Sequence, residues 1–239
     1  MSAAIDPIEK KPLACFMPGT RTASFGTYGC NLGCVFCQNH GLSQGQYEQE
    51  DDALFVPPQR IVEMALRHGC PSVSYTYSEP TVFAEYAMDI ARLAHEAGLK
   101  NVLVSNGFIG EQAASELYPL MDAANIDMKG WTDEFYPTMC DASREPVLAS
   151  LKRLRRLGVH LEVTTLVIPG KNDAPDAIDG WLEWAAENLG HETPLHFSAY
   201  FPAFRCTIPR TQPDTLYRIR RQAHEAGFPN VFLGNIRPL

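Results

Sequence analysis

The feature that most constrains the fold of this 239-residue chain is a repeated alternation of a short apolar strand with a longer helix. The helical segments have apolar residues spaced for one buried face, and several of them stop at a glycine. This alternation predicts parallel strands covered by helices. The predicted strands are Thr22–Gly29, Ser72–Ser78, Asn101–Ser105, Asn125–Met128, His160–Ile168, Leu195–Phe201 and Val231–Leu233. The predicted helices are Pro57–His68, Thr81–Ala97, Glu111–Leu117, Pro146–Leu157, Ala174–Asn188 and Asp214–Ala226.

These six or seven strand–helix units are too few to close an eight-fold barrel. We therefore predict an α/β fold with a partial (β/α)6 TIM-like barrel, a mostly parallel sheet and outer helices. A doubly wound sheet is the second possibility. Because the chain has no linker, repeat or low-complexity tract, residues 1–239 are predicted to form one domain, with residues 1–21 as a lead-in segment.

In both architectures, ligands bind at the carboxyl ends of the strands. Polar and glycine-containing segments fall at these ends, and they are Gly29–Cys37, Tyr77–Pro80, Ser105–Gly107, Asp127–Gly130, Pro169–Asp173 and Tyr200–Pro202. Their shared location predicts a functional site at that edge of the sheet.

The charge balance narrows the classes of partner. The formal net charge is −8, so a broad surface for nucleic acid or an anionic membrane is not predicted. The basic stretch from Lys152 to Arg156 is interpreted as a solvated helix face. The first residues lack the apolar run of a secretory signal, and no stretch reaches the roughly 18 apolar residues of a membrane helix. We therefore expect a cytoplasmic protein with no membrane association.

Three of the seven cysteines, Cys30, Cys34 and Cys37, form a tight cluster with the spacing C-x3-C-x2-C. Three thiolates on a glycine-containing loop suit a soft metal centre. A 4Fe–4S cluster held by three cysteines would keep one iron open for another ligand. The competing interpretation is a structural zinc site with His40 as the fourth ligand, although the usual second pair of ligands is missing.

The segment C-x3-C-x-aromatic-C, with Phe36 at the aromatic position, resembles the signature of the radical S-adenosylmethionine (SAM) superfamily. Other strand ends resemble segments of pyruvate formate-lyase activating enzyme. These are Tyr77-Ser78-Glu79-Pro80, Val104-Ser105-Asn106-Gly107-Phe108, Ile126-Asp127-Met128-Lys129 and Val167-Ile168-Pro169-Gly170 followed by Asn172-Asp173. The resemblance runs over nearly the full length.

A closer similarity is to the branch called AmmeMemoRadiSam. The similar segments are Asp6-Pro7-Ile8-Glu9-Lys10-Lys11-Pro12-Leu13, Pro18-Gly19-Thr20 and Phe36-Cys37-Gln38-Asn39. Members of that branch usually carry a Cys-rich extension before this point. Without it, we expect one cluster and no auxiliary metal site.

The resemblance implies reductive cleavage of SAM at a 4Fe–4S cluster on Cys30, Cys34 and Cys37, giving a 5′-deoxyadenosyl radical that abstracts hydrogen from a substrate. It also implies a flavodoxin- or ferredoxin-type reductant. The residues implied to contact SAM are Val35, Phe36, Gln38, Tyr77, Ser78, Glu79, Ser105, Asn106, Asp127, Met128, Lys129 and Thr164. Glu79 stands out among them, because a carboxylate at a strand end beside a proline has little structural reason to be there.

This sequence departs from the activating enzyme at several positions. Tyr77 and Ser78 replace two glycines, Thr164 replaces an arginine, and Phe201 stands where the activating enzyme has a histidine. His196, five residues earlier, is expected to be structural.

Catalytic residues are not identified by the sequence. Cys140 and Cys206 lie in loops after strand ends, so either could donate a hydrogen atom or a thiol to a substrate radical. The ordinary role of a single cysteine, and the one expected for Cys15 and Cys70, is that of a small buried hydrophobe.

Three functions remain open at this point. The first is a radical SAM enzyme that acts on an unidentified small molecule or macromolecule, or as an activase that abstracts hydrogen from a glycine of a partner protein. The second is a non-catalytic zinc-binding protein. The third is a simple electron-transfer protein.

Overall fold

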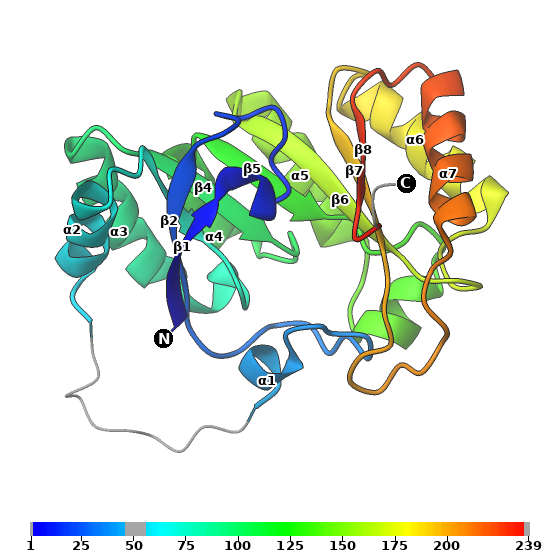
Figure 1. The fold of residues 1–239 in the computed structure, drawn as a ribbon, viewed down its shortest axis with the longest axis horizontal. Helices are drawn as coiled ribbons and strands as arrows, with labels where there is room; N and C mark the ends of the chain where they lie inside the picture. Colours follow the sequence, from blue (N-terminus) through cyan, green and yellow to red (C-terminus); the bar gives the residue numbers. More distant parts are fainter. Residues whose placement is uncertain (1, 46–55, 237–239) are drawn as a thin grey trace.

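The computed structural model describes residues 2–45 and 56–236, which form one curved sheet with helices on its outer side (Figure 1). The strands are β1 (Ser2–Pro7), β2 (Arg21–Gly26), β3 (Ser72–Tyr75), β4 (Lys100–Ser105), β5 (Ala123–Asp127), β6 (His160–Val167), β7 (Leu195–Ala199) and β8 (Val231–Gly234). Their order in the sheet follows the chain, so no strand order reverses as a doubly wound sheet requires. Within these residues, β1 pairs only with β2 and β8 only with β7. The predicted partial barrel is confirmed.

The strand β1 is a correction to the sequence analysis, which expected a lead-in segment without a strand. It runs antiparallel to β2, whereas β2 to β8 are all parallel. The register pairs Ser2 with Gly26 and Pro7 with Arg21. The single-domain boundaries remain a prediction, since residues 1 and 237–239 lie outside the described residues.

The helices are α1 (His40–Ser43), α2 (Pro58–Arg67), α3 (Ala84–Glu96), α4 (Glu111–Leu117), α5 (Glu145–Leu157), α6 (Pro175–Asn188) and α7 (Pro213–Glu225). A proline opens α2, α6 and α7, where its missing N–H costs nothing. Helix α5 ends at Gly158, whose φ of +73° suits glycine. Figure 1 shows α2 and α3 beside the first strands and α6 and α7 beside the last ones. In the described part of the chain, no helix is both long and apolar enough to cross a membrane.

The outer face of the sheet carries the main apolar core. Ala23 and Phe25 of β2 alternate toward this core and are fully buried with Ile61 and Ala65 of α2. Burial of such side chains contributes about 1.5–3 kcal/mol each for the large ones. The outer core therefore fixes the curvature that points the inner face of every strand toward the barrel interior.

The lead-in segment packs against the inner face of the sheet at the end where the strands begin. Ile8 and Leu13 of that segment are fully buried in a second apolar cluster with Val102 of β4 and Ala123 of β5. The backbone of Pro12 accepts a hydrogen bond from the Asn125 side chain at 2.7 Å. The segment therefore closes the end of the barrel where the strands begin and leaves the carboxyl ends for the site.

Candidate functional site

The three clustered cysteines lie on the loop between β2 and α1, at the carboxyl end of β2. A single π-helical turn, Tyr136–Cys140, lies along this loop. Gly33 donates its N–H to the carbonyl of Cys140 at 2.8 Å, and Val35 donates to the carbonyl of Met139 at 3.0 Å. On the other side, the N–H of Arg205 donates to the carbonyl of Val35 at 2.9 Å. The loop is therefore held by two segments that are distant in the sequence.

Each cysteine sulfur has its own polar neighbours. The Cys30 Sγ receives the N–H of Leu32 at 3.4 Å and the side-chain amide of Asn106 at 3.6 Å. The Cys37 Sγ lies 3.1 Å from the hydroxyl of Ser43. Hydrogen bonds to the sulfurs are a main way in which proteins stabilise iron–sulfur clusters and set their potentials.

The electrostatic surroundings of the thiols differ. The hydrogen bond with the Cys140 thiol lowers the pKa of Cys34 below its ordinary value, and the cationic Lys129 acts in the same direction. Burial raises the pKa of Cys30 to about 11, and the carboxylate of Glu79 adds to that rise. A bound cation would stabilise both thiolates, so this loop fits a metal centre chemically.

The zinc interpretation needs His40 to turn toward the cysteines. Its ring instead stacks on Phe204 with the centroids 5.0 Å apart, and Nδ1 faces the carbonyl of Cys37 at 3.3 Å. Within residues 2–45 and 56–236, no three His, Cys, Asp or Glu side chains converge on a point that could hold a single ion. A cubane cluster differs here, because each thiolate binds a different iron and the sulfurs need not converge.

The carboxylate of Glu79 lies at the carboxyl end of β3 and is only 1% exposed. Its Oε1 accepts the N–H and hydroxyl of Thr81 at 2.9 and 2.8 Å and the hydroxyl of Ser105 at 2.8 Å. Its Oε2 accepts the N–H of Asn106 at 2.8 Å. The expectation that this carboxylate lacks a structural role is wrong, because it caps the turn after β3 and joins β3 to β4. Burial raises its pKa above the usual value.

Ser105 and Asn106 at the end of β4 extend this network. Beyond its bond to Cys30, the Asn106 amide donates to the side chain of Asn31 at 2.9 Å, and its Oδ1 accepts the N–H of Phe108 at 2.7 Å. The network therefore connects the end of β4 to the cysteine loop directly. Asn106 therefore both bridges to the cysteine loop and forms the turn that continues into Gly107, whose φ is +70°.

Asp127 and Lys129 form an ion pair of 2.6 Å at the end of β5. Burial alone would lower the pKa of Lys129, but the Asp127 carboxylate and the Cys34 thiolate outweigh it and raise the pKa above its usual range. The cation is thus retained beside the cysteine loop. Met128 behaves differently, since its side chain is buried in the core and its sulfur lies 3.8 Å from the Tyr136 hydroxyl.

The residues predicted to contact adenine are placed unequally. Phe36 is buried, and its ring packs against Phe135 with the centroids 6.1 Å apart. Both backbone groups of Val35 already have protein partners. Gln38 is exposed next to Cys37. These contacts to adenine remain predictions.

Two hydroxyls near the strand ends are buried without a hydrogen-bond partner among the described residues, Ser78 Oγ and Thr164 Oγ1. Thr164 pairs with Asp127 in the register of β5 and β6, so it lies at the level of the ion pair. Buried polar atoms without partners are uncommon in folded proteins and often mark a ligand site. These two hydroxyls and the Lys129 cation lie at or near the carboxyl ends of β6, β3 and β5.

Three of the remaining sequence predictions, Cys140, Cys206 and Phe201, lie in segments that follow strand ends, whereas His196 lies near the start of β7. Cys140 lies against Cys34 and is fully buried. Cys206 follows Arg205, whose N–H holds the cysteine loop, and it is also buried. Phe201 is half-exposed, with the guanidinium of Arg210 5.0 Å from its ring. His196 donates to the buried carboxylate of Glu162 at 2.6 Å, which is the structural role expected for it.

Asn39 is a residue that the sequence reasoning missed as a site residue. Its amide donates to the carbonyl of Tyr77 at 2.9 Å and so links the cysteine loop to the end of β3. The signal was the segment Phe36-Cys37-Gln38-Asn39, which was used only as a family resemblance.

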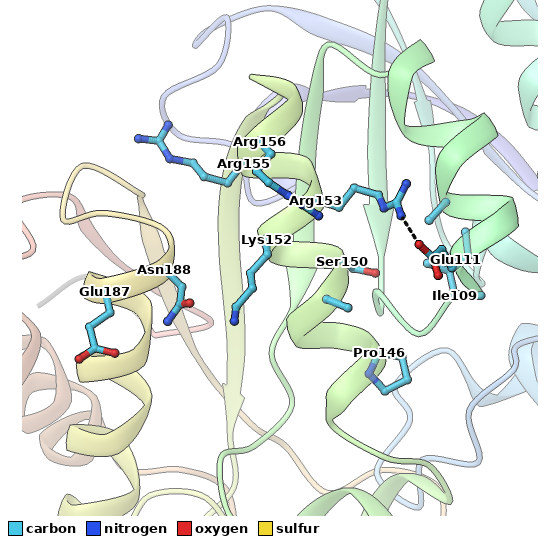
Figure 2. A pocket seen from close by; sticks show the side chains of 13 residues that line it. Ile109, Glu111, Pro146, Ser150, Lys152, Arg153, Arg155, Arg156, Glu187 and Asn188 are labelled. Atoms are coloured by element: carbon cyan, nitrogen blue, oxygen red, sulfur yellow. Dashed lines mark hydrogen bonds and ion pairs between the residues drawn. The ribbon is translucent and has the colours of Figure 1, made fainter.

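A cavity of about 760 Å³ lies elsewhere, on the outer side of the barrel beside α4, α5 and α6 (Figure 2). Its walls include Lys152, Arg153, Arg155 and Arg156 of α5, and Arg153 pairs with Glu111 at 3.2 Å. None of the predicted SAM contacts lines this cavity. Since α5 covers the outer face of β6, we assign the site to the barrel mouth and not to this groove.

An open parallel barrel with a three-cysteine loop at its mouth defines the class of enzymes that hold an iron–sulfur cluster with an open iron. The sequence profile described as the radical SAM superfamily matches residues 25–182. The chain belongs to the radical SAM superfamily.

One relative is the uncharacterized protein MJ0808 of Methanocaldococcus jannaschii. It is 43% identical over 236 residues, which cover 98% of this chain and 70% of that protein. Among solved structures, a radical SAM methyltransferase from Sphaerobacter thermophilus has a TM-score of 0.70 at 16% identity, with 92% of this chain and 68% of that chain covered. A domain of pyruvate-formate lyase-activating enzyme from Bacteroides vulgatus has a TM-score of 0.60 at 16% identity, covering 69% and 99%. At these identities the two structures show the fold alone. Membership in the superfamily carries with it a 4Fe–4S cluster and SAM as cofactors.

Proposed function

We propose that this chain binds SAM at the barrel mouth, against a cluster on Cys30, Cys34 and Cys37, and abstracts hydrogen from a substrate held over that mouth. The observation that carries the proposal is the hydrogen-bonded chain from the Cys30 sulfur through Asn106 to Glu79. It joins the cysteine loop to the ends of β3 and β4. When bound, the cluster and SAM supply the 5′-deoxyadenosyl radical by reductive cleavage of SAM.

The residues of the chain bind and orient. Lys129 keeps its positive charge and binds the carboxylate of the methionyl group of SAM. The hydroxyls of Ser78 and Thr164, which have no partner among the described residues, form hydrogen bonds with the polar atoms of the same methionyl group. Glu79 keeps Oε2 with one protein partner, which leaves capacity for the methionyl amine. An electron donor of the flavodoxin or ferredoxin type and a cytoplasmic location complete the proposal.

A protein substrate is the second candidate, with the chain acting as a glycyl-radical activase. It is favoured by the large apolar side chains exposed near the cysteine loop. Val82 packs near Gly29 of that loop and is 42% exposed, and Phe204, which stacks on His40, is 37% exposed. Exposed apolar groups around a site suit a protein surface.

The deciding experiment is anaerobic reconstitution followed by addition of dithionite and SAM. We expect about four irons and four sulfides per chain, absorbance near 400 nm that bleaches on reduction, and formation of 5′-deoxyadenosine. A variant with all three cysteines changed to serine is the control. One zinc and no iron would contradict the proposal, and a cluster that yields no 5′-deoxyadenosine would identify an electron-transfer protein.

The cysteine candidates are tested by the same assay with a substrate added, so that substrate turnover is measured beside the cleavage of SAM. If Cys206 donates hydrogen or a thiol to the substrate, Cys206→Ser loses turnover of that substrate and keeps cleavage of SAM. Cys140→Ser serves as the comparison, because Cys140 lies against the cluster ligand Cys34.

A further inference from the structure

Tyr77 has a backbone conformation that its side chain disfavours. Its φ is +72°, in the left-handed region that glycine adopts freely and that bulky residues rarely enter. The strand β3 ends at Tyr75 for this reason, three residues before the end predicted from the sequence. Such a conformation persists only where the surroundings enforce it.

The lead-in segment supplies that enforcement. The Tyr77 hydroxyl donates to Asp6 Oδ2 at 2.5 Å, and the Lys11 ammonium lies 4.4 Å from the centre of the Tyr77 ring. Lys11 is only 2% exposed and donates to Asp6 Oδ2 at 2.8 Å. Burial and the hydrogen bond to Asp6 raise the pKa of Tyr77 to about 12, so the phenol remains the donor.

The contacts of Asp6 and Lys11 with Tyr77, called the clamp below, act one residue before Ser78 of the candidate SAM site. Ser78 follows Tyr77, its N–H donates to the carbonyl of Thr76 at 3.0 Å, and its hydroxyl is buried without a partner in the described part of the chain. On the cysteine side, Asn39 fixes the carbonyl of Tyr77. The orientation of the Ser78 hydroxyl therefore follows from the conformation of Tyr77.

We propose that Asp6 and Lys11 are positioning residues for SAM, which act by clamping Tyr77 in the left-handed conformation and so presenting Ser78 to the methionyl group. This inference rests on the proposed SAM site at the barrel mouth. According to this inference, Asp6 and Lys11 of the lead-in segment affect the affinity for SAM indirectly, through Tyr77.

The test is a set of variants of the cluster-loaded enzyme, in which the Kd for SAM is measured by anaerobic calorimetry and the Tm is measured without SAM. Tyr77→Phe removes the hydroxyl and keeps the ring, so we expect the Kd to rise about tenfold. Tyr77→Gly needs no clamp, because glycine adopts this φ freely, so it provides the background in which loss of the clamp should not matter. Lys10→Ala is the comparison variant, since the exposed Lys10 binds the other oxygen of Asp6 at 2.7 Å and lies 6.0 Å from the centre of the Tyr77 ring, farther than Lys11, so its loss should change the Kd much less than Tyr77→Phe does.

The decisive comparison is Asp6→Asn in two backgrounds, the wild type and Tyr77→Gly. In the wild-type background the substitution should raise the Kd about tenfold, and in the Tyr77→Gly background it should have little effect. Equal effects in both backgrounds, or a lower Tm with an unchanged Kd in Tyr77→Phe, would overturn the inference. If the wild type itself binds no SAM, the proposed SAM site fails, and that result is distinct from failure of the clamp. Tyr77→Phe leaves the Asp6–Lys11 pair intact, so the test stands even if Asp6→Asn unfolds.

Discussion

Glu162 and Thr164 lie two positions apart on the inner face of β6, and they differ in whether the protein satisfies their hydrogen-bonding groups. Glu162 accepts hydrogen bonds from the N–H groups of Ala14 and Cys15 at 3.0 and 2.8 Å and from both neighbouring histidines. Thr164 has a buried hydroxyl with no partner among the described residues. On the same strand, the protein therefore supplies hydrogen bonds to the carboxylate of Glu162 and none, among the described residues, to the hydroxyl of Thr164.

On β6 this difference separates the two ends of the barrel, although Ser72 Oγ, at the first residue of β3, is also buried without a partner among the described residues. At the amino end of the strands, the lead-in segment closes the interior and completes the bonding of Glu162. At the carboxyl end, the Asp127–Lys129 pair and the unpartnered hydroxyls leave bonding capacity next to the cysteine loop. A group that the protein satisfies by itself contributes to stability, whereas an unsatisfied one costs stability until a ligand arrives.

The largest expected effect is at the open end, where a cluster ligand can be removed. Cys34→Ser should reduce iron to below about one per chain after reconstitution, because two thiolates do not hold a 4Fe–4S cluster well. Cys15→Ser is the control and should keep about four irons, because Cys15 of the lead-in segment is exposed and not buried as the sequence predicted. Iron and sulfide analysis measures both. A Cys34→Ser protein that still holds about four irons per chain would show that this loop does not bind the cluster as proposed.

At the closed end, Glu162→Gln should lower the free energy of unfolding at pH 7 by about 2–4 kcal/mol and leave the Kd for SAM unchanged. Burial alone would raise the pKa of Glu162, but the hydrogen bonds it accepts lower it from 4.5 to about 2. A carboxyl whose pKa falls on folding stabilises the fold above its unfolded pKa, and this contribution is lost as the pH drops through the folded one.

Urea unfolding of the cluster-free proteins between pH 7 and pH 3 measures this term. The wild type should lose stability relative to Glu162→Gln as the pH falls below about 4.5. Parallel pH curves for the two proteins would show that Glu162 is not bound as the structure has it.

Lys129→Met returns to the open end, with a smaller effect than loss of the cluster. Removal of the cation should raise the Kd for SAM about tenfold, since a charge-assisted bond to a carboxylate is lost. The Asp127 side chain is 34% exposed, so loss of the ion pair should change the free energy of unfolding by no more than about 1 kcal/mol. Lys129→Arg keeps the charge and should retain most of the affinity. An unchanged Kd for SAM in Lys129→Met would show that the methionyl carboxylate does not bind at Lys129.

The contrast between the two ends also explains how much the sequence could predict. The seven parallel strands and the cysteine loop follow from local patterns, so both were predicted with errors of only a few residues at most boundaries. Strand β1 was missed, because Ser2–Pro7 has little apolar alternation and forms through pairing with β2. The bond between Asp6 and Tyr77 joins residues 71 apart in the sequence, which no local pattern encodes. Glu79 was misjudged partly for the same reason, since Ser105 and Asn106 at the end of β4 become its neighbours only in the fold, although its bonds to Thr81 are local.

The smallest expected effect comes from Thr164→Val, which removes the unpartnered hydroxyl and keeps the shape of the side chain. Because this hydroxyl is buried without a hydrogen bond, its loss should leave the free energy of unfolding unchanged or raise it by about 0.5–1 kcal/mol. The Kd for SAM should rise about threefold, since the ligand loses one neutral hydrogen bond. Thr22→Val is the matched substitution at the closed end, where the hydroxyl lies 2.7 Å from that of Ser74, and there we expect a loss of about 1 kcal/mol with an unchanged Kd. If Thr164→Val destabilised the cofactor-free protein as much as Thr22→Val does, the hydroxyl would have a protein partner, and the two ends of the barrel would not differ in the way inferred from β6.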